Sequence, residues 1–230
     1  MGTSIILSRP RVSSLLALLV ILLASWGIYH AARIGFADAA AYKAKYQVKG
    51  WTRDNRLPTE VELDYALEQI STAMAWEPGN PQHINLKADI LIYKSLLHWQ
   101  DEQFSAITHE AVLLYRQSLM RRPGWPYTWA RLALAKAYSA EFDEIFIEAI
   151  DKAVKLGPWE PTVHLILAEA GIYGWTYLNN FTRQQIIDNV HRGLRFNQAA
   201  LDKTAVRYQK KDILCAYLPN DKHTQEFCGW

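Results

Sequence analysis

The sequence predicts an all-α protein in which a single N-terminal transmembrane helix is followed by a solenoid of helical repeats. Three observations lead to this fold class. A long uncharged apolar run lies near the N-terminus, and a two-proline motif recurs along the rest of the chain. No segment shows the strict alternation of polar and apolar residues that indicates a half-buried strand.

The first observation is the run from Val12 to Ala32, which contains no charged residue. Its 21 residues match the roughly 20 that an α-helix needs to cross the hydrocarbon core. A cleaved signal peptide is the alternative, with Arg9 and Arg11 as its basic region. Because bulky Trp26 follows the small residues at 24 and 25, no clean cleavage site is present, and we expect an uncleaved anchor.

The anchor divides the N-terminal part of the chain into three expected segments. These are a short basic tail over residues 1–11, the transmembrane anchor over 12–32 and a juxtamembrane stalk over 33–57. The stalk shows no clear apolar period, and we expect a frayed helix or no single conformation there. Basic residues flank the anchor on both sides, so the positive-inside rule does not fix its orientation. A short tail inside and a domain outside the inner membrane is the usual arrangement.

The second observation is the recurring motif of two prolines three residues apart. Its copies are Pro78–Pro81, Pro123–Pro126 and Pro158–Pro161, which begin 45 and 35 residues apart. Proline lacks an amide hydrogen and suits the first turn of a helix, so each copy ends one helix and begins the next. A period near 34 residues is typical of stacked helix pairs.

The segments before these motifs resemble helix B of tetratricopeptide repeats, which carries small, aromatic and small residues before its closing proline. The corresponding residues are Ala66, Ile70 and Ala73; Ala111, Tyr115 and Ser118; and Phe146, Ile150 and Ala153. The third set departs from the pattern at its first small position. The resemblance implies degenerate tetratricopeptide-like repeats over 58–198, followed by a capping helix and C-terminal tail over 199–230.

Individual helices show further signals. Thr59 with Glu62, and Thr182 with Gln185, have the spacing of capping boxes at helix starts. The segment from Phe142 to Leu156 carries the clearest amphipathic stripe in the chain. The last helix, expected from Ala199 to Leu218, is more polar, as the end of a solenoid should be.

Composition and motifs favour a protein without catalytic function. The formal net charge of +2 and a pI near 8.4 give no indication of nucleic-acid binding. The sequence has no glycine-rich phosphate loop, nucleophile elbow or paired-histidine zinc helix. We therefore expect no cofactor and no metal, and an enzyme with an unrecognised site is the weakest hypothesis. A metal held by Cys215, His223, Cys228 and Asp221 matches no standard zinc module.

Three groups of residues are candidates for contacts or covalent links. The aromatic candidates for partner or glycan contact are Trp125, Tyr127, Trp129, Trp159 and Trp175, with packing between helix pairs as the alternative for each ring. A candidate basic docking face consists of Lys203, Arg207, Lys210 and Lys211, with a solvated capping surface as the alternative. Cys215 and Cys228 are the only cysteines and form a candidate disulfide, with free thiols as the alternative.

One run of residues resembles a more specific family. Arg-Arg-Pro-Gly-Trp-Pro-Tyr-Thr-Trp-Ala-Arg-Leu-Ala, from Arg121 to Ala133, together with the N-terminal anchor, is similar to the VpsP family of bacterial exopolysaccharide biosynthesis proteins. This resemblance implies a scaffold that docks a polysaccharide polymerase, a glycosyltransferase or an export component, without any catalytic residue. The alternative is an assembly chaperone like the tetratricopeptide subunits of cytochrome c maturation, which hold a partner peptide.

Overall fold

The computed structural model describes residues 9–230, with side chains from Ser13 onward, so most of the predicted basic tail lies outside the described residues. The described part is helical and contains no strand, which confirms the all-α prediction. Its helices are α1 Arg9–Asp54, α2 Glu60–Trp76, α3 Pro81–Leu97, α4 Gln103–Arg121, α5 Pro126–Tyr138, α6 Glu144–Leu156, α7 Pro161–Tyr173, the 3₁₀ turn η1 Trp175–Tyr177, α8 Asn180–Arg207, α9 Lys211–Tyr217 and α10 Lys222–Cys228.

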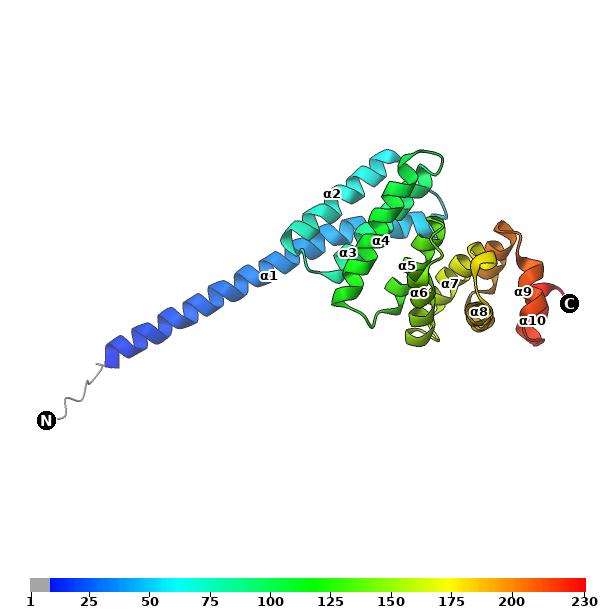
Figure 1. Ribbon diagram of the computed structural model, residues 1–230. Coiled ribbons are helices and arrows are strands. Elements are labelled where there is room, and N and C mark those ends of the chain that lie inside the picture. Colours follow the sequence, from blue (N-terminus) through cyan, green and yellow to red (C-terminus); the bar gives the residue numbers. More distant parts are fainter. Residues whose placement is uncertain (1–8) are drawn as a thin grey trace.

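Consecutive helices pack as pairs, and the pairs stack into a solenoid (Figure 1). The pairs are α1 with α2, α3 with α4, α5 with α6, and α7 with α8. Each predicted two-proline motif joins one pair to the next, and Pro81, Pro126 and Pro161 are the first residues of α3, α5 and α7. The first turn of a helix tolerates a residue without an amide hydrogen, so these prolines set where each pair begins.

The anchor helix is longer than the sequence predicts. α1 continues without interruption to Asp54, so the expected stalk over 33–57 is mostly an ordered part of the domain. Ala37, Ala44 and Trp51 are almost fully buried, and the last two share an apolar cluster with residues of α2. The sequence did not predict this packing, because Ala37 and Ala44 carry little hydrophobic signal, although their small side chains allow two helices to approach closely.

The N-terminal half of α1 projects away from the packed helices (Figure 1). Its most apolar 18-residue window has a mean hydropathy of 2.0 and is 0% buried against the protein. Length and composition make this helix able to cross a membrane. The same helix continues into the first pair, so the candidate membrane span and the first helix of the domain are one continuous helix.

The helix starts agree with the predictions in one case and correct them in another. Thr59 and Glu62 form the predicted capping box, with the Glu62 carboxylate also held by Arg56 at 2.5 Å. The predicted capping box of Thr182 and Gln185 is wrong. The helix begins earlier, because Asn179 accepts a hydrogen bond from the amide of Thr182 and serves as the N-cap.

The C-terminal end of the solenoid also differs from the prediction. The expected helix from Ala199 to Leu218 is two helices, because α8 ends at Arg207 and α9 starts at Lys211. Gln209 lies between them with a φ of 54°, which turns the chain. α8 in turn bends at Asn197, where φ is −141° and the helical conformation is interrupted. The amphipathic stripe of α6 is confirmed, with Phe146 and Ile150 fully buried.

Candidate functional site: a groove lined by the first helices of the pairs

A groove with a volume of about 580 Å³ lies between the end of α1 and the helices α3, α5 and α7. These are the first helices of successive pairs, so stacking brings residues far apart in sequence to one surface. The apolar part of the lining comes from Ile92, Leu96, Leu134, Leu165 and Ile166. Trp51 and Val48 of α1 line one end, so the anchor helix itself contributes to the site.

The first polar cluster in the groove joins three helices. Asp89 of α3 accepts a hydrogen bond of 2.7 Å from the hydroxyl of Tyr115 on α4. The Nε of Arg131 on α5 lies 3.1 Å from the same carboxylate oxygen. Burial raises the pKa of Asp89 above its usual range, and the Arg131 charge opposes that rise. The Arg131 side chain is two-thirds buried, and its guanidinium provides a fixed positive charge within a mostly apolar surface.

The second polar cluster lies further along the groove around Glu169 of α7. One oxygen of this carboxylate accepts hydrogen bonds from the hydroxyls of Tyr138, at 3.1 Å, and Tyr208, at 2.9 Å. The guanidinium of Arg207 lies 3.5 Å from the same oxygen. Tyr173 packs edge-on against both tyrosine rings and holds them in place.

The tyrosine hydroxyls of both clusters keep their protons at physiological pH. Burial raises the pKa of Tyr115 and of Tyr138 well above the ordinary value, and it also raises the pKa of Tyr208. Each hydroxyl is therefore a hydrogen-bond donor to its carboxylate. The arrangement resembles a binding surface, because apolar side chains alternate with charged and hydrogen-bonding groups held in fixed positions.

The predicted aromatic candidates do not line the groove. Trp125, Tyr127 and Trp129 gather instead near the turn before α5, where the rings of Trp125 and Tyr127 are 5.3 Å apart and Arg122 stacks on Trp125 at 3.6 Å. Trp129 donates its indole hydrogen to the carbonyl of Pro123 at 2.7 Å. Each of these rings is half-buried.

The two remaining aromatic candidates, Trp159 and Trp175, differ in their exposure to solvent. Trp159 lies in the turn before α7 and is 62% exposed. The neighbouring Glu160 accepts a hydrogen bond from the hydroxyl of Tyr127, which brings the last two proline turns close together. Trp175 is buried and packs against Tyr217, so packing within the C-terminal part accounts for this ring.

The predicted basic docking face is divided by the break between α8 and α9. Lys203 and Arg207 lie on α8, whereas Lys210 and Lys211 belong to the next turn and helix. Lys211 forms an ion pair of 2.6 Å with Asp202, and Arg207 faces Glu169 of the groove. The four residues are therefore not one unpaired positive surface.

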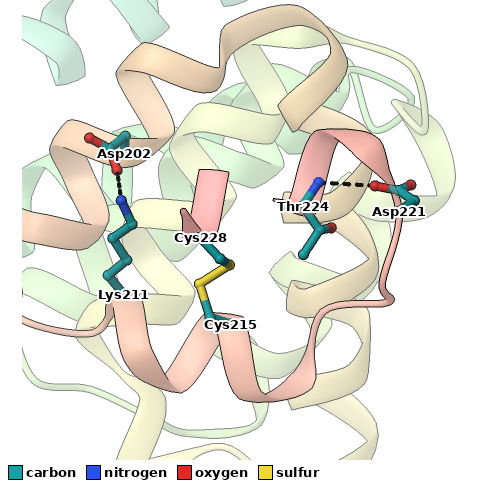
Figure 2. The surroundings of a disulfide bond; sticks show 6 residues. All are labelled: Asp202, Lys211, Cys215, Asp221, Thr224 and Cys228. Carbon is teal, nitrogen blue, oxygen red and sulfur yellow. Dashed lines mark hydrogen bonds and ion pairs between the residues drawn. A yellow bond between two sulfur atoms is a disulfide. The ribbon is translucent and has the colours of Figure 1, made fainter. Parts of the chain in front are cut away.

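The two cysteines form a disulfide that joins α9 to the end of α10 (Figure 2). The bond closes a loop with a sequence separation of 13 residues, and Asp221 caps α10 inside that loop by accepting from the amide of Thr224. His191 of α8 also contacts Asp221 at 2.6 Å, which fastens the loop to the solenoid. With both sulfur atoms in this bond, the alternative of a metal held by Cys215 and Cys228 has no thiolates to use.

Sequence reasoning missed both the groove clusters and a third group of polar residues. Asp38, Glu77 and His83 come together where α1, α2 and α3 meet. Their positions in the sequence show no metal-binding or catalytic motif. Only the packing of the anchor helix onto the first repeat brings them together, and that packing was not expected.

Comparison with known proteins adds no assignment. No protein-family model matches the chain, and a search of curated proteins finds no match. The resemblance to the VpsP family therefore stays a prediction that rests on the run from Arg121 to Ala133 and on the anchored architecture.

Proposed function

We propose that this protein is a non-enzymatic, membrane-anchored scaffold whose groove binds a segment of a partner protein. One observation carries the proposal: the groove combines apolar side chains with fixed charges at Arg131 and Glu169 and is built from the first helices of successive pairs. An extended surface of this kind suits a peptide segment. The continuous α1 helix would hold that partner close to the membrane.

The proposed context is exopolysaccharide biosynthesis, polymerisation or export. Its support is the similarity of the run from Arg121 to Ala133 to the VpsP family. The partners would then be a polymerase, a glycosyltransferase or an export component. The proposed location is a bacterial inner membrane with the domain in the periplasm. The Cys215–Cys228 disulfide supports this location, because such bonds persist in oxidising compartments.

An assembly chaperone of the cytochrome c maturation type is the second candidate. The same groove favours it, since an apoprotein segment would need the same combination of apolar contacts and fixed charges. Direct glycan stacking on Trp125 and Trp159 is a subsidiary idea that the 62% exposure of Trp159 supports. Unchanged glycan binding after both tryptophans are replaced by alanine would remove it.

The test is affinity capture of the full-length protein from gently solubilised native membranes, compared with two variants. Ile166→Glu places a charge on the apolar lining of the groove, and Leu113→Glu places the same charge on α4 at a residue that is 49% exposed and outside the lining. Thermal unfolding establishes that both variants fold.

We expect the wild type and Leu113→Glu to retain the same partner and Ile166→Glu to lose it. A polymerase, glycosyltransferase or exporter among the retained proteins supports the scaffold. Haem-ligation proteins or apocytochromes among the retained proteins would instead support the assembly chaperone. Equal retention by a folded Ile166→Glu variant would refute a role for the groove.

A further inference from the structure

Three potential metal ligands meet where the anchor helix joins the first helix pairs. Asp38 lies on α1, Glu77 is the C-cap of α2 and His83 is in the first turn of α3. Each offers one ligand atom, and these atoms all lie within 4.8 Å of one another. Because the residues come from three different helices, the tertiary fold assembles the cluster.

The histidine in this cluster lacks the hydrogen bonds that a buried imidazole needs. His83 is only 3% exposed, and its Nδ1 is buried without a hydrogen-bond partner. Its Nε2 faces Oδ1 of Asp38 at 3.7 Å, which is too long for a hydrogen bond. With the ring proton on Nδ1, the lone pair of Nε2 points toward the carboxylate and is free to ligate an ion.

The two carboxylates of the cluster also form no ion pair with an arginine or lysine among the residues with described side chains. Arg33, Arg121 and Arg122 line the hollow beside Asp38 and Glu77, but none of the three pairs with these carboxylates, and Arg122 stacks on Trp125 instead. Arg33 donates instead to the backbone carbonyl of Trp76, at 2.5 Å. The cluster therefore offers two carboxylates and one imidazole nitrogen to an ion entering from solvent.

We propose that Asp38, Glu77 and His83 bind a divalent transition-metal ion, with Zn²⁺ as the best fit. Zn²⁺ takes histidine nitrogen and carboxylate oxygen at about 2.0–2.2 Å, so tetrahedral ligand atoms lie about 3.3–3.6 Å apart. The 3.7 Å between His83 and Asp38 is close to that spacing. Imidazole disfavours Mg²⁺ and Ca²⁺, which prefer oxygen ligands only.

The surroundings of the ligands suit such an ion. The amide of Asn80 donates to Oε2 of Glu77 at 2.9 Å, which orients the carboxylate and leaves its other oxygen available. The Asp38 side chain is 68% exposed, so the ion has a path from solvent and a water can complete the coordination. Bound there, the ion would fix the angle at which α1 enters the domain.

The experiment uses the full-length chain without a histidine tag, in detergent micelles and after treatment with a chelator. Isothermal titration with Zn²⁺ should show a single site, and added Zn²⁺ should raise the melting temperature whereas Mg²⁺ should not. Substitution with Co²⁺ should produce visible ligand-field absorption. Asp38→Asn and His83→Gln should each weaken Zn²⁺ binding by at least about tenfold.

The matched control is His109→Gln, which removes a histidine with a side chain that is 58% exposed on α4 and should leave binding unchanged. Asp38→Asn keeps the test decisive if His83→Gln fails to fold, because Asp38 is a surface residue. Absence of Zn²⁺ binding to the wild type would overturn the proposal. Binding of undiminished affinity to a folded Asp38→Asn variant would overturn it as well.

Discussion

Arg131 on α5 lies with its Nε 3.1 Å from the carboxylate of Asp89 on α3, and this contact links two helix pairs across the floor of the groove. The two residues are 42 positions apart in the sequence. Tyr115 donates to the same carboxylate from a third helix. The charged groups that would meet a partner are therefore also part of what holds successive pairs in register.

Replacing Arg131 by methionine should destabilise the protein, because it leaves the Asp89 carboxylate buried without its counter-charge. Breaking a buried pair typically costs about 3–5 kcal/mol, and we expect about 2–3 kcal/mol here because Arg131 is one-third exposed. Unfolding of the full chain in detergent measures the change. Arg116→Met, which removes an exposed arginine on α4, is the matched control and should have little effect.

The loss of stability in Arg131→Met should depend on pH. The folded pKa of Asp89 is already raised by burial, so the folded state binds this proton more readily than the unfolded state. Without Arg131 that pKa rises further. The loss in Arg131→Met is therefore largest near neutral pH and shrinks as the pH falls through the raised pKa. An equal loss at about pH 7 and about pH 4 would show that Asp89 is not its cause.

A substitution at Gly171 on α7 tests how tightly α7 and α8 are packed. A Cβ at this position would lie 2.5–2.7 Å from three side-chain atoms of Ile186 on α8, which is itself fully buried. We expect Gly171→Ala to cost about 1–3 kcal/mol through overpacking. Gly124→Ala is the control, because a Cβ there meets nothing within 4 Å. A neutral effect at both positions would mean that α7 and α8 adjust freely.

The helix boundaries that depend on local chemistry could be predicted from the sequence. Pro81, Pro126 and Pro161 fix helix starts through a covalent ring, and Thr59 fixes another through its own side chain. Such signals act within a few residues, so they can be read without knowledge of the fold. The Thr182 prediction failed because Asn179 offers a competing cap three residues earlier.

The groove and the cluster of Asp38, Glu77 and His83 could not be predicted in the same way. The groove brings together Asp89, Arg131 and Glu169 only because the helix pairs stack with a particular rotation. No local sequence pattern encodes that rotation. The extension of α1 was missed for a related reason. Its buried alanines become significant only when α2 packs against them, and Asp38 joins Glu77 through that packing.

The disulfide should stabilise the C-terminal end of the protein. For a loop of this length, chain entropy predicts about 3 kcal/mol, so replacing both cysteines by serine should lower the free energy of unfolding by about 2–3 kcal/mol. A reducing agent should destabilise the wild type similarly and leave the double-serine variant unchanged. In intact cells, a thiol reagent should label the wild type only after reduction. Labelling without reduction would contradict the proposed periplasmic location.

Glu62 should stabilise the start of α2 in a pH-dependent way. Hydrogen bonds from Arg56 and from the backbone of Thr59 lower its pKa from 4.5 to about 2. A lowered carboxyl pKa contributes stability above 4.5 that is lost as the pH falls toward 2. Glu62→Gln should therefore lower the free energy of unfolding at neutral pH by less than about 1 kcal/mol, because solvent screens the pair, and the difference should vanish in acid. Glu68→Gln, on an exposed position of the same helix, should show neither effect.

A substitution at Trp51 tests whether the end of α1 belongs to the folded domain. Its indole is 1% exposed and packs edge-on against Tyr93 of α3 at 5.2 Å. Replacing it by alanine should leave a cavity and cost about 3–5 kcal/mol. Tyr46→Ala removes a ring that is 66% exposed on the same helix and should change stability by less than about 0.5 kcal/mol. If the two variants unfold at the same temperature, residues 37–54 form a separate stalk after all. A large loss in Trp51→Ala alone would mean that the end of α1 is packed into the folded domain, where Trp51 also lines the groove.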